Sequence, residues 1–493
     1  MLLLGIDIGT SSIKVSVVDA HTQRSLITVS YPESEREILA LHPDWAEQSP
    51  QQWWDDAVLA IKTAHASKKY NPADIKAIGI SYQMHGLVMV DKNKELIRNS
   101  IIWCDSRAVE TGNNAFKTIG KEKCLSTLLN SPGNFTASKL SWVQNNEPDN
   151  YNKTYKIMLP GDYIAMKLTG EITSSISSLS EGMFWDFKEK ELSKDVFNHF
   201  NFDKSLIPGI KNVFDNHGQI SEKIARELCL PKNVIVSYKA GDQPNNALSL
   251  NVMNPGEFAA TAGTSGVIYG VADHLISDPQ SRVNSFAHVN HTDETTRIGV
   301  LLCINGTGIL NSWVKNISGN NFSYNEMNAK AATIKAGSDG LFIIPFGNGA
   351  ERILNNKTVN AQLHNIDFNR HSPAHIFRAS QEGIAFAFRY GLDIMRENNM
   401  QPAVIRAGMA NMFLSDVFTQ AFVDVTNVPV ELCNADGSIG AALGAGIGAG
   451  IFPDAKEAFS NIQPLKIITP KQHALYNDLY QDWKTVLQKM ISN

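Results

Sequence analysis

Cysteine is scarce in this sequence and its spacing does not fit a structural role. The 493 residues include five cysteines, and no two of them form a Cys-x-x-Cys pair. Zinc cages need closely spaced cysteines, and disulfide frameworks need an even number of them. A chain of this length can bury large cores without either device. The scattered thiols therefore indicate reduced cysteines in a reducing compartment.

Basic runs and long apolar runs are also missing. The 44 Lys and Arg residues against 49 Asp and Glu residues leave a net charge of -5, with no basic stripe of the kind that binds nucleic acid. The N-terminus lacks the pattern of a signal peptide. The most apolar stretch elsewhere, residues 439–452, is shorter than the roughly 20 residues that cross a bilayer. We expect a cytoplasmic protein with neither nucleic acid nor membrane as partner.

The familiar catalytic and nucleotide motifs are absent as well. The sequence has no GxxxxGK[ST] loop and no HRD and DFG pair, which excludes P-loop and protein-kinase chemistry. It also lacks HExxH and GxSxG. Any nucleotide chemistry must therefore use another phosphate-binding device.

One strand-turn-strand pattern occurs twice. Residues 2–19 read as two apolar strands around a Gly-Thr-Ser turn, and residues 257–269 repeat this pattern. The turn threonines, Thr10 and Thr264, stand 254 positions apart, about half the chain. This spacing predicts a duplicated architecture. Strands alternate with helices elsewhere, which predicts the α/β class and a boundary within residues 238–255.

Local signals predict several further elements. Ser49 before Pro50 is typical of a helix start. We expect strands at residues 75–81, within 96–103, at 340–346 and at 403–407, a turn at 159–162 before a helix, and helices from Ser131 onward, from Ser372 onward and after Ser438.

The two Gly-Thr-Ser turns are candidate phosphate sites. Tight turns expose backbone N–H groups that can point at an anion, and small hydroxyl side chains add donors. The candidates are Thr10, Ser11 and the nearby Lys14 in the first turn, and Gly263, Thr264 and Ser265 in the second. A plain hairpin turn is the alternative for either copy alone. Two copies, each opening one half of the chain, favour phosphate binding.

Two aspartates stand at the ends of apolar strands. Asp7 precedes the first turn, where a carboxylate fits Mg²⁺, or alternatively stabilises the turn. Asp242 lies at a strand-to-helix junction, where it can accept a proton from a substrate hydroxyl. The alternative for Asp242 is a helix N-cap.

Other polar groups follow buried strands. Gln83, Met84 and His85 follow the strand at residues 75–81, at the position where open α/β sheets bind ligands. Trp103 and Asp105 follow another apolar stretch; the alternative for them is a core Trp and a surface ion pair with Arg107. The Gly/Ala-rich segments at residues 408–411 and 440–450 permit either adenine stacking or tight helix packing.

These motifs together resemble the FGGY family of carbohydrate kinases. The resemblance runs over nearly the whole chain, in order, through GIDIGTSSIK, ISYQMHG, IIWCDSR, PGNFTASKLSWV, LPGDYIAMKLTGE, AGDQPNNA, ATAGTSG and GAALGAG. It implies an actin-like α/β fold of two lobes, each with a ribonuclease H-like core, around a catalytic cleft. The sugar-binding lobe would be residues 1–245 and the nucleotide-binding lobe 246–493.

The resemblance also implies roles for individual residues. Asp242 would be the general base and, with Asp7 acting through water, would hold Mg²⁺. Sugar contacts would come from Gln83, Met84, His85, Trp103, Asp105, Asp242 and Gln243. ATP would be bound by Thr10, Ser11, Lys14, Gly263, Thr264, Ser265, Gly308, Gly408, Met409 and Asn411.

The implied reaction is phosphorylation of D-xylulose to D-xylulose 5-phosphate, because the Met84–His85 pair is the form found in family members acting on that ketose. Alternatives are a family kinase of another ketose or polyol, and a non-catalytic actin-like sugar sensor or ATPase. We also expect a homodimer to be possible.

Overall fold

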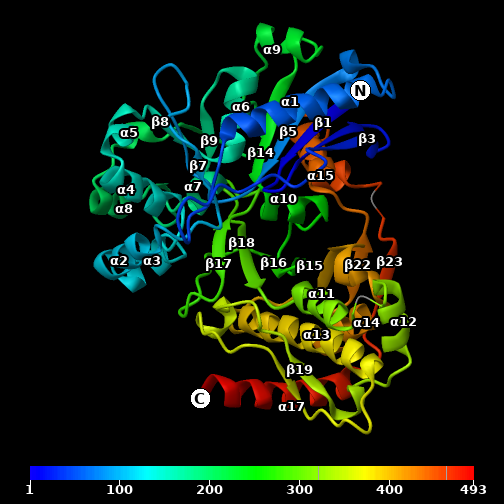
Figure 1. Cartoon of the computed structure of the whole chain (residues 1–493). Helices are drawn as coiled ribbons and strands as arrows, with labels where there is room; N and C mark the ends of the chain where they lie inside the picture. Colours follow the sequence, from blue (N-terminus) through cyan, green and yellow to red (C-terminus); the bar gives the residue numbers. More distant parts are fainter. Residues whose placement is uncertain (320, 462, 493) are drawn as a thin grey trace.

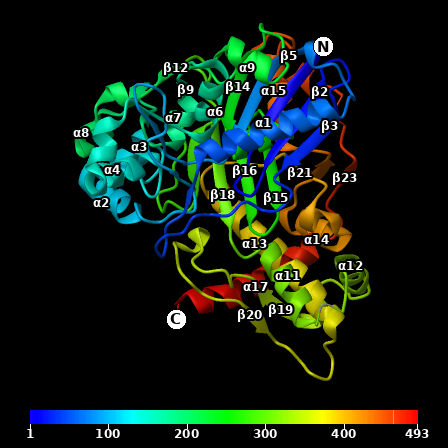
Figure 2. The same ribbon diagram turned by 45° about the horizontal axis from the view of Figure 1, so that its top comes forward.

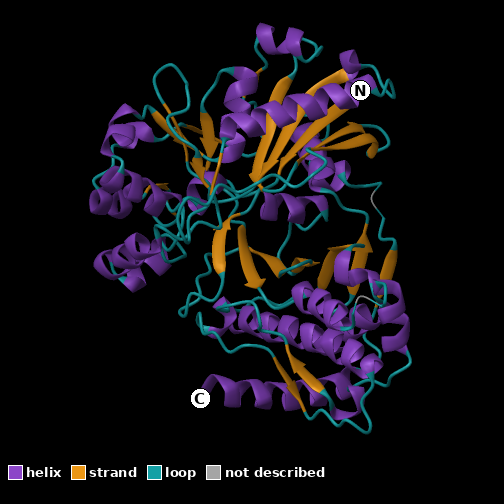
Figure 3. Cartoon of the chain, in the orientation of Figure 1, coloured by secondary structure: helices purple, strands orange, loops and turns teal. Residues whose placement is uncertain are grey.

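The computed structural model describes residues 1–319, 321–461 and 463–492. Figures 1 and 3 show two α/β lobes, each built on one large sheet, with the chain passing between them near α10 (Asp242–Ser249). The duplicated two-lobe α/β arrangement predicted from the sequence is confirmed.

The two large sheets share one topology. In the first, the order is β3-β2-β1-β5-β14. Strands β3, β2 and β1 pair antiparallel to one another, and β5 and β14 continue the sheet parallel to β1. In the second, β18-β16-β15-β21-β22 repeats this pattern. The predicted hairpins are the first two strands of each sheet.

The strands of the first sheet are β1 (Leu2–Ile8), β2 (Ile13–Asp19), β3 (Arg24–Tyr31), β5 (Ile75–Tyr82), β13 (Gly218–Gln219) and β14 (Ile235–Gly241). Those of the second are β15 (Glu257–Ala262), β16 (Gly266–Ala272), β17 (Asn284–Ala287), β18 (Ile298–Ile304), β21 (Val404–Gly408), β22 (Val430–Cys433) and β23 (Lys466–Ile468). Short pairs are β4 (Glu47–Gln48) with β7 (Ser100–Ile101), β6 (Val88–Val90) with β8 (Lys156–Met158), β9 (Thr173–Ser175) with β12 (Gly209–Lys211), β10 (Trp185–Asp186) with β11 (Glu191–Leu192), and β19 (Phe342–Ile344) with β20 (Gln362–His364).

The helices before α10 are α1 (Pro50–Ala66), α2 (Val109–Ile119), α3 (Lys121–Thr127), α4 (Thr136–Asn146), α5 (Pro148–Lys153), α6 (Pro160–Thr169), α7 (Ile176–Glu181), α8 (Lys194–Phe200) and α9 (Glu222–Glu227). Those after it are α11 (Gly308–Ile317), α12 (Tyr324–Ala332), α13 (Pro373–Glu397), α14 (Asp416–Thr426), α15 (Gly437–Gly448), α16 (Ala455–Ala458) and α17 (His473–Ser492).

Helices cover both faces of the first sheet, which explains why its central strands are apolar on both sides. Helices α1 and α6 pack on one face, where Figure 2 shows α1 crossing the strands. Helices α10 and α15 pack on the other face. Burial on both faces makes β1 and β5 continuous hydrophobic runs in the sequence.

Helix α15 comes from the second half of the chain but packs on the backbone of the first sheet. Gly5 and Gly79 are register partners on β1 and β5. A Cβ atom at Gly5 would lie 1.8 Å from the Ser438 carbonyl oxygen, and one at Gly79 would lie 1.9 Å from that of Ala441. Of the two alternatives for residues 440–450, tight helix packing is the one that the structure shows.

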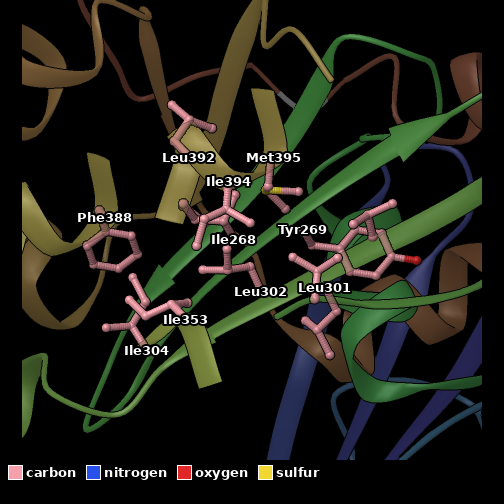
Figure 4. Close-up of a cluster of buried hydrophobic side chains, with 14 of the residues drawn as sticks. Ile268, Tyr269, Leu301, Leu302, Ile304, Ile353, Phe388, Leu392, Ile394 and Met395 are labelled. Atoms are coloured by element: carbon pink, nitrogen blue, oxygen red, sulfur yellow. The ribbon is translucent and has the colours of Figure 1, made fainter. Parts of the chain in front are cut away.

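The second lobe has its own apolar core. Figure 4 shows side chains of β16 and β18, such as Ile268 and Leu302, meeting Leu392 and Met395 of α13. The C-terminal α17 packs outside α13, and Trp483 Nε1 donates a hydrogen bond to the Ile343 carbonyl at 2.9 Å.

The lobes also meet along the edge strand β17. Its backbone amides are satisfied by side chains of the first lobe: Ser285 N donates to Asn130 Oδ1 at 2.9 Å, and Ala287 N donates to Ser180 Oγ at 2.9 Å. These bonds replace the neighbouring strand that an edge otherwise lacks.

The strand expected within residues 96–103 is confirmed as β7, a short strand that pairs with β4. One local prediction was wrong in detail. The turn expected at residues 159–162 is instead the first turn of α6, with Pro160 at the position where a missing N–H costs nothing. The predicted Ser49 cap of α1 is confirmed, since Ser49 Oγ accepts from Gln52 N at 3.4 Å.

Across the three described ranges, we find no helix with both the length and the apolar character that crossing a membrane requires.

The packing of α15 predicts that Gly79→Ala destabilises the protein strongly. The added methyl group would collide with the Ala441 backbone, and overpacking of this kind costs about 1–3 kcal/mol or more. Thermal unfolding measures the effect. Gly209→Ala is the matched control, because a Cβ there meets nothing within 4 Å, and it should change stability by less than about 0.5 kcal/mol. Equal melting temperatures for the two variants would contradict the packing argument.

Candidate active site

The carboxyl ends of three parallel strands bring the main candidates together. β1, β5 and β14 lie side by side, so Asp7, the segment after Tyr82 and Asp242 reach one edge of the first sheet. Ligands of open α/β sheets bind at such an edge. Helix α10 begins at Asp242 and lies on the side of the sheet that faces the second lobe (Figure 1).

Asp242 is a half-buried carboxylate with an unusual pKa. Burial, and then the negative charge of Asp7, raise the pKa of Asp242 to about 7. The N-cap of α10 is Gly241, and Asp242 already lies inside the first turn. Asp242 is therefore not the N-cap residue of α10, although its carboxylate accepts hydrogen bonds from Gln243 and from its own backbone N–H within the first turn.

Asp7 lies beside Lys14 on β2 and Ser81 on β5. Burial raises the pKa of Asp7 above the usual carboxyl value, although the Ser81 hydroxyl and the charge of Lys14 oppose this. Lys14 Nζ itself pairs with Asp436 Oδ2 at 3.1 Å, at the start of α15.

The two aspartates have the right chemistry for Mg²⁺. Carboxylate oxygens are hard ligands, and Mg²⁺ binds through one or two of them together with water and substrate phosphate oxygens. Among the residues that the structure describes, no three His, Cys, Asp or Glu side chains gather as a complete metal cage. Asp7 and Asp242 would supply the protein ligands of such a site.

The first Gly-Thr-Ser turn is joined to candidate sugar residues. Thr10 Oγ1 donates to Gln83 Oε1 at 3.2 Å and accepts from Trp103 Nε1 at 2.9 Å. Trp103 is 53% exposed, so it is not a core residue. Ser11 is exposed at the tip of the turn, and its carbonyl accepts from Arg36 N at 2.8 Å.

His85 is held neutral in an aromatic corner. Its ring meets Phe135 and Phe286 with centroid distances of 4.7 and 5.4 Å. Burial, followed by the positive charges of Lys139 and Arg352, lowers the pKa of His85 to about 3. Its Nδ1 atom is buried and has no hydrogen-bond partner within the described residues, so it can serve a ligand.

The carboxylate of Asp105 is occupied by other groups of the protein. Asp105 is fully buried, and its carboxylate accepts from Arg107 Nη2 at 2.7 Å and from Ala46 N at 2.6 Å. Arg107 in turn lies 3.8 Å above the Trp45 ring. The ion pair is real but buried rather than at the surface. A direct ligand contact by Asp105 stays a prediction that this geometry does not favour.

The second Gly-Thr-Ser turn packs against the start of α11. Gly308 N donates to the Gly263 carbonyl at 2.9 Å, and a Cβ at Gly308 would lie 2.2 Å from that oxygen. Thr264 and Ser265 are exposed.

A cavity of about 450 Å³ opens beside this turn. The size is within the range of small-molecule sites. Its lining comes from the hairpin, α11, α12 and the segment after β21: Ala262, Gly263, Thr264, Gly308, Ile309, Asn311, Ser312, Tyr324, Asn325, Asn328, Asn411, Met412, Leu414 and Ser415.

Of the candidates Gly408, Met409 and Asn411, only Asn411 lines this cavity. Gly408 ends the strand, and Met409 N donates to the Cys433 carbonyl at 2.9 Å. The Met409 side chain is exposed.

Several residues near these groups were not found from the sequence. Glu181 accepts a hydrogen bond from His85 N, Lys139 donates to the His85 carbonyl, and the charge of Arg352 acts on His85. Asn311 is 8% exposed, and its Oδ1 has no partner within the described residues. No local pattern in the sequence singles these residues out.

Comparison with known proteins agrees with this geometry. Models for the N-terminal and C-terminal domains of the FGGY family of carbohydrate kinases match residues 2–249 and 258–450. A xylulose kinase of Staphylococcus epidermidis is 29% identical over 495 residues, covering 99% of this chain and 97% of the relative.

Solved structures show the same fold. A crystal structure of a "xyloylose kinase" from Brucella ovis superposes with a TM-score of 0.89 at 24% identity over 100% of both chains. A glycerol kinase from Plasmodium falciparum, with ADP, gives 0.89 at 20% identity over 99% of this chain and 98% of that one. The chain therefore belongs to the FGGY family of carbohydrate kinases and has their actin-like fold, which makes it a phosphotransferase that uses ATP and a carbohydrate.

Proposed function

We propose that the protein phosphorylates the O5 hydroxyl of D-xylulose with ATP, forming D-xylulose 5-phosphate and ADP. The observation that carries the proposal is Asp242, a carboxylate with a pKa of about 7 that shares one sheet edge with Met84 and His85. The xylulose kinase of S. epidermidis, similar over nearly the whole chain, supports this choice of sugar.

Asp242 acts as the general base in this proposal. The proton of O5–H moves to its carboxylate while O5 bonds to the γ-phosphorus of ATP and the bond from that phosphorus to the β–γ bridging oxygen breaks. A base with a pKa near 7 is unprotonated often enough at neutral pH and still strong enough to take the proton. Because phosphoryl transfer passes through a loose transition state, positioning and charge supply most of the remaining catalysis.

The two hairpin turns bind the phosphates. Their N–H groups and hydroxyls, from Thr10 and Ser11 on one side and from Gly263, Thr264, Ser265 and Gly308 on the other, offset the negative charge of ATP. Mg²⁺, held by Asp242 and through water by Asp7, would neutralise phosphate charge when bound. Lys14 adds positive charge beside Asp7. Its ammonium group is paired with Asp436 in this structure, so it would have to leave Asp436 to contact a phosphate directly.

The sugar lies against the first lobe, within residues 1–245, and the nucleotide against the second, residues 246–493. The unpartnered Nδ1 of His85 bonds a sugar hydroxyl, and Trp103 offers an apolar face to the carbon chain. Gln83, Met84 and Gln243 complete the proposed sugar contacts. Asn411 lines the cavity that would take the nucleoside, with Gly408 and Met409 at its approach.

Another sugar is the second candidate, because the fold does not discriminate among substrates. The P. falciparum glycerol kinase shares it with a TM-score of 0.89. The possible homodimer and the cytoplasmic location stay predictions from the sequence.

Coupled ADP release tests the reaction directly. The native protein should turn over D-xylulose faster than D-ribulose, xylitol, glycerol or gluconate. Asp242→Asn, which keeps the shape but removes the base, should lower kcat by about 10²–10⁴-fold. Asp149→Asn, an exposed aspartate in the first turn of α5, is the matched control and should leave kcat unchanged.

The outcomes separate the parts of this proposal. Turnover of another sugar but not of D-xylulose would keep the base and replace the substrate. Full kcat in Asp242→Asn would overturn the base.

The raised pKa of Asp242 predicts the pH dependence of kcat/KM. Because the base must be unprotonated, kcat/KM should fall about tenfold per pH unit below pH ~7 and level off above it. Steady-state rates from about pH 5.5 to about pH 9 measure this. A profile that stays flat down to about pH 5.5 would mean that the base has an ordinary carboxyl pKa.

The cavity predicts a nucleotide contact by Asn311. Losing a hydrogen bond from its amide should raise the KM for ATP by about 2–12-fold, while the KM for the sugar stays unchanged. Asn316→Ala, on the exposed side of the same helix, is the control for Asn311→Ala. An unchanged KM for ATP in Asn311→Ala would place the nucleotide elsewhere.

A further inference from the structure

His85 has a backbone conformation that its surroundings must maintain. Its φ is 61°, in the left-handed region that non-glycine residues seldom adopt. Such a residue costs free energy and persists only where neighbouring groups determine its conformation. The side chains that hydrogen-bond the backbone N–H and the carbonyl of His85 therefore determine how its ring is placed.

Glu181 holds the amino side of His85. Its Oε1 accepts a hydrogen bond from His85 N at 3.2 Å, and the residue is only 1% exposed, at the end of α7. Its other oxygen, Oε2, packs against Gly241, where a Cβ atom would lie 2.8 Å from it and 2.6 Å from Met84 Cγ. Glu181 thus lies between the Met84–His85 pair and the residue preceding Asp242.

Lys139 holds the carbonyl side of His85. Its Nζ donates to the His85 carbonyl at 2.8 Å and to the Ile102 carbonyl at 2.9 Å. The side chain is fully buried on α4, and within the described residues it has no carboxylate at salt-bridge distance. Burying an ammonium group is costly, and the negative charges of Asp105 and Glu181 offset this only without direct contact. The two carbonyl bonds are therefore a specific arrangement.

The second carbonyl extends this arrangement to another sugar candidate. Ile102 immediately precedes Trp103, whose indole donates to Thr10 at 2.9 Å. One ammonium group therefore links the segment that carries His85 to the segment that carries Trp103.

We propose that Glu181 and Lys139 are positioning residues for the sugar. They hydrogen-bond the backbone N–H and the carbonyl of His85 and so fix the position of its ring relative to Trp103 and Asp242. The proposal rests on the proposed function in taking His85 as a sugar contact. Neither residue touches the reacting atoms in this account. Their contribution is to sugar affinity and to discrimination between sugars.

The test compares KM values for the sugar and for ATP. Lys139→Met keeps the length of the side chain but removes its donors, and Glu181→Ala removes the acceptor. Each should raise the KM for the sugar by about tenfold or more and narrow the preference among the panel sugars, while the KM for ATP changes by less than about twofold. Glu181→Gln keeps an oxygen acceptor for His85 N and should recover most of the native KM.

Lys156→Met is the matched control. Lys156 Nζ also donates to two backbone carbonyls, those of Ser205 at 2.7 Å and Ile207 at 2.9 Å, in the same lobe. The variant should leave both KM values unchanged. If Lys139→Met does not fold, Lys139→Gln gives the same test, because its shorter amide cannot reach both carbonyls.

A second readout needs no turnover. The His85 imidazole signals in protein with isotope-labelled histidine should shift in Lys139→Met and in Glu181→Ala, and stay in place in Lys156→Met.

The measurements distinguish a failure of this positioning role from a failure of the proposed function. If another sugar is the substrate, the KM comparison uses that sugar and only the assignment of D-xylulose falls. Native-like sugar KM and His85 signals in folded Lys139→Met and Glu181→Ala would overturn the positioning role alone. Equal increases in KM for sugar and ATP, or no recovery with Glu181→Gln, would also overturn it, because they indicate general loss of structure.

Discussion

The contact between α15 and the bare backbone of the first sheet is the constraint on which the rest of the site depends. Gly5 and Gly79 let the helix approach until no side chain fits between them. The close approach brings Asp436, the N-cap of α15, to Lys14, which faces Asp7 across the hairpin. It also brings Asn245, which lies three residues beyond Asp242 on α10, close enough to donate a hydrogen bond to the Gly437 carbonyl at 2.9 Å. One packing contact thus helps to set the relative positions of Asp7 and Asp242.

The same site concentrates charge that burial disfavours. Asp7, Asp242 and Glu181 all have pKa values raised by burial, and the charge of Asp242 adds to the effect on Glu181. Lys139 has its pKa lowered to about 7 by the same physical cause. Groups held away from their ordinary ionisation are typical of functional sites. They stay buried because the packing of the surrounding strands and helices outweighs the free-energy cost of burying ionisable groups.

Much of this fold follows from local signals, while much of the site does not. Alternating apolar residues and Gly-Thr-Ser turns predicted both hairpins, and the ends of buried strands pointed to Asp7, His85 and Asp242. Glu181 and Lys139 were missed because their bonds to His85 join residues 96 and 54 positions away, which no local pattern encodes. The resemblance to the family implied a sugar contact by Asp105, which stays a prediction. The ion pair with Arg107 was the alternative considered from the sequence, but its burial could not be read from two residues close together in the chain.

The origin of α15 has a consequence for how the chain is made. The helix that covers one face of the first sheet, α15, follows most of the second lobe in the sequence, so that face cannot close until most of the second lobe has been synthesised. Until then the exposed backbone around Gly5 and Gly79 faces water or other chains. The first lobe is therefore completed only after most of the second, and its assembly depends on that of the other lobe.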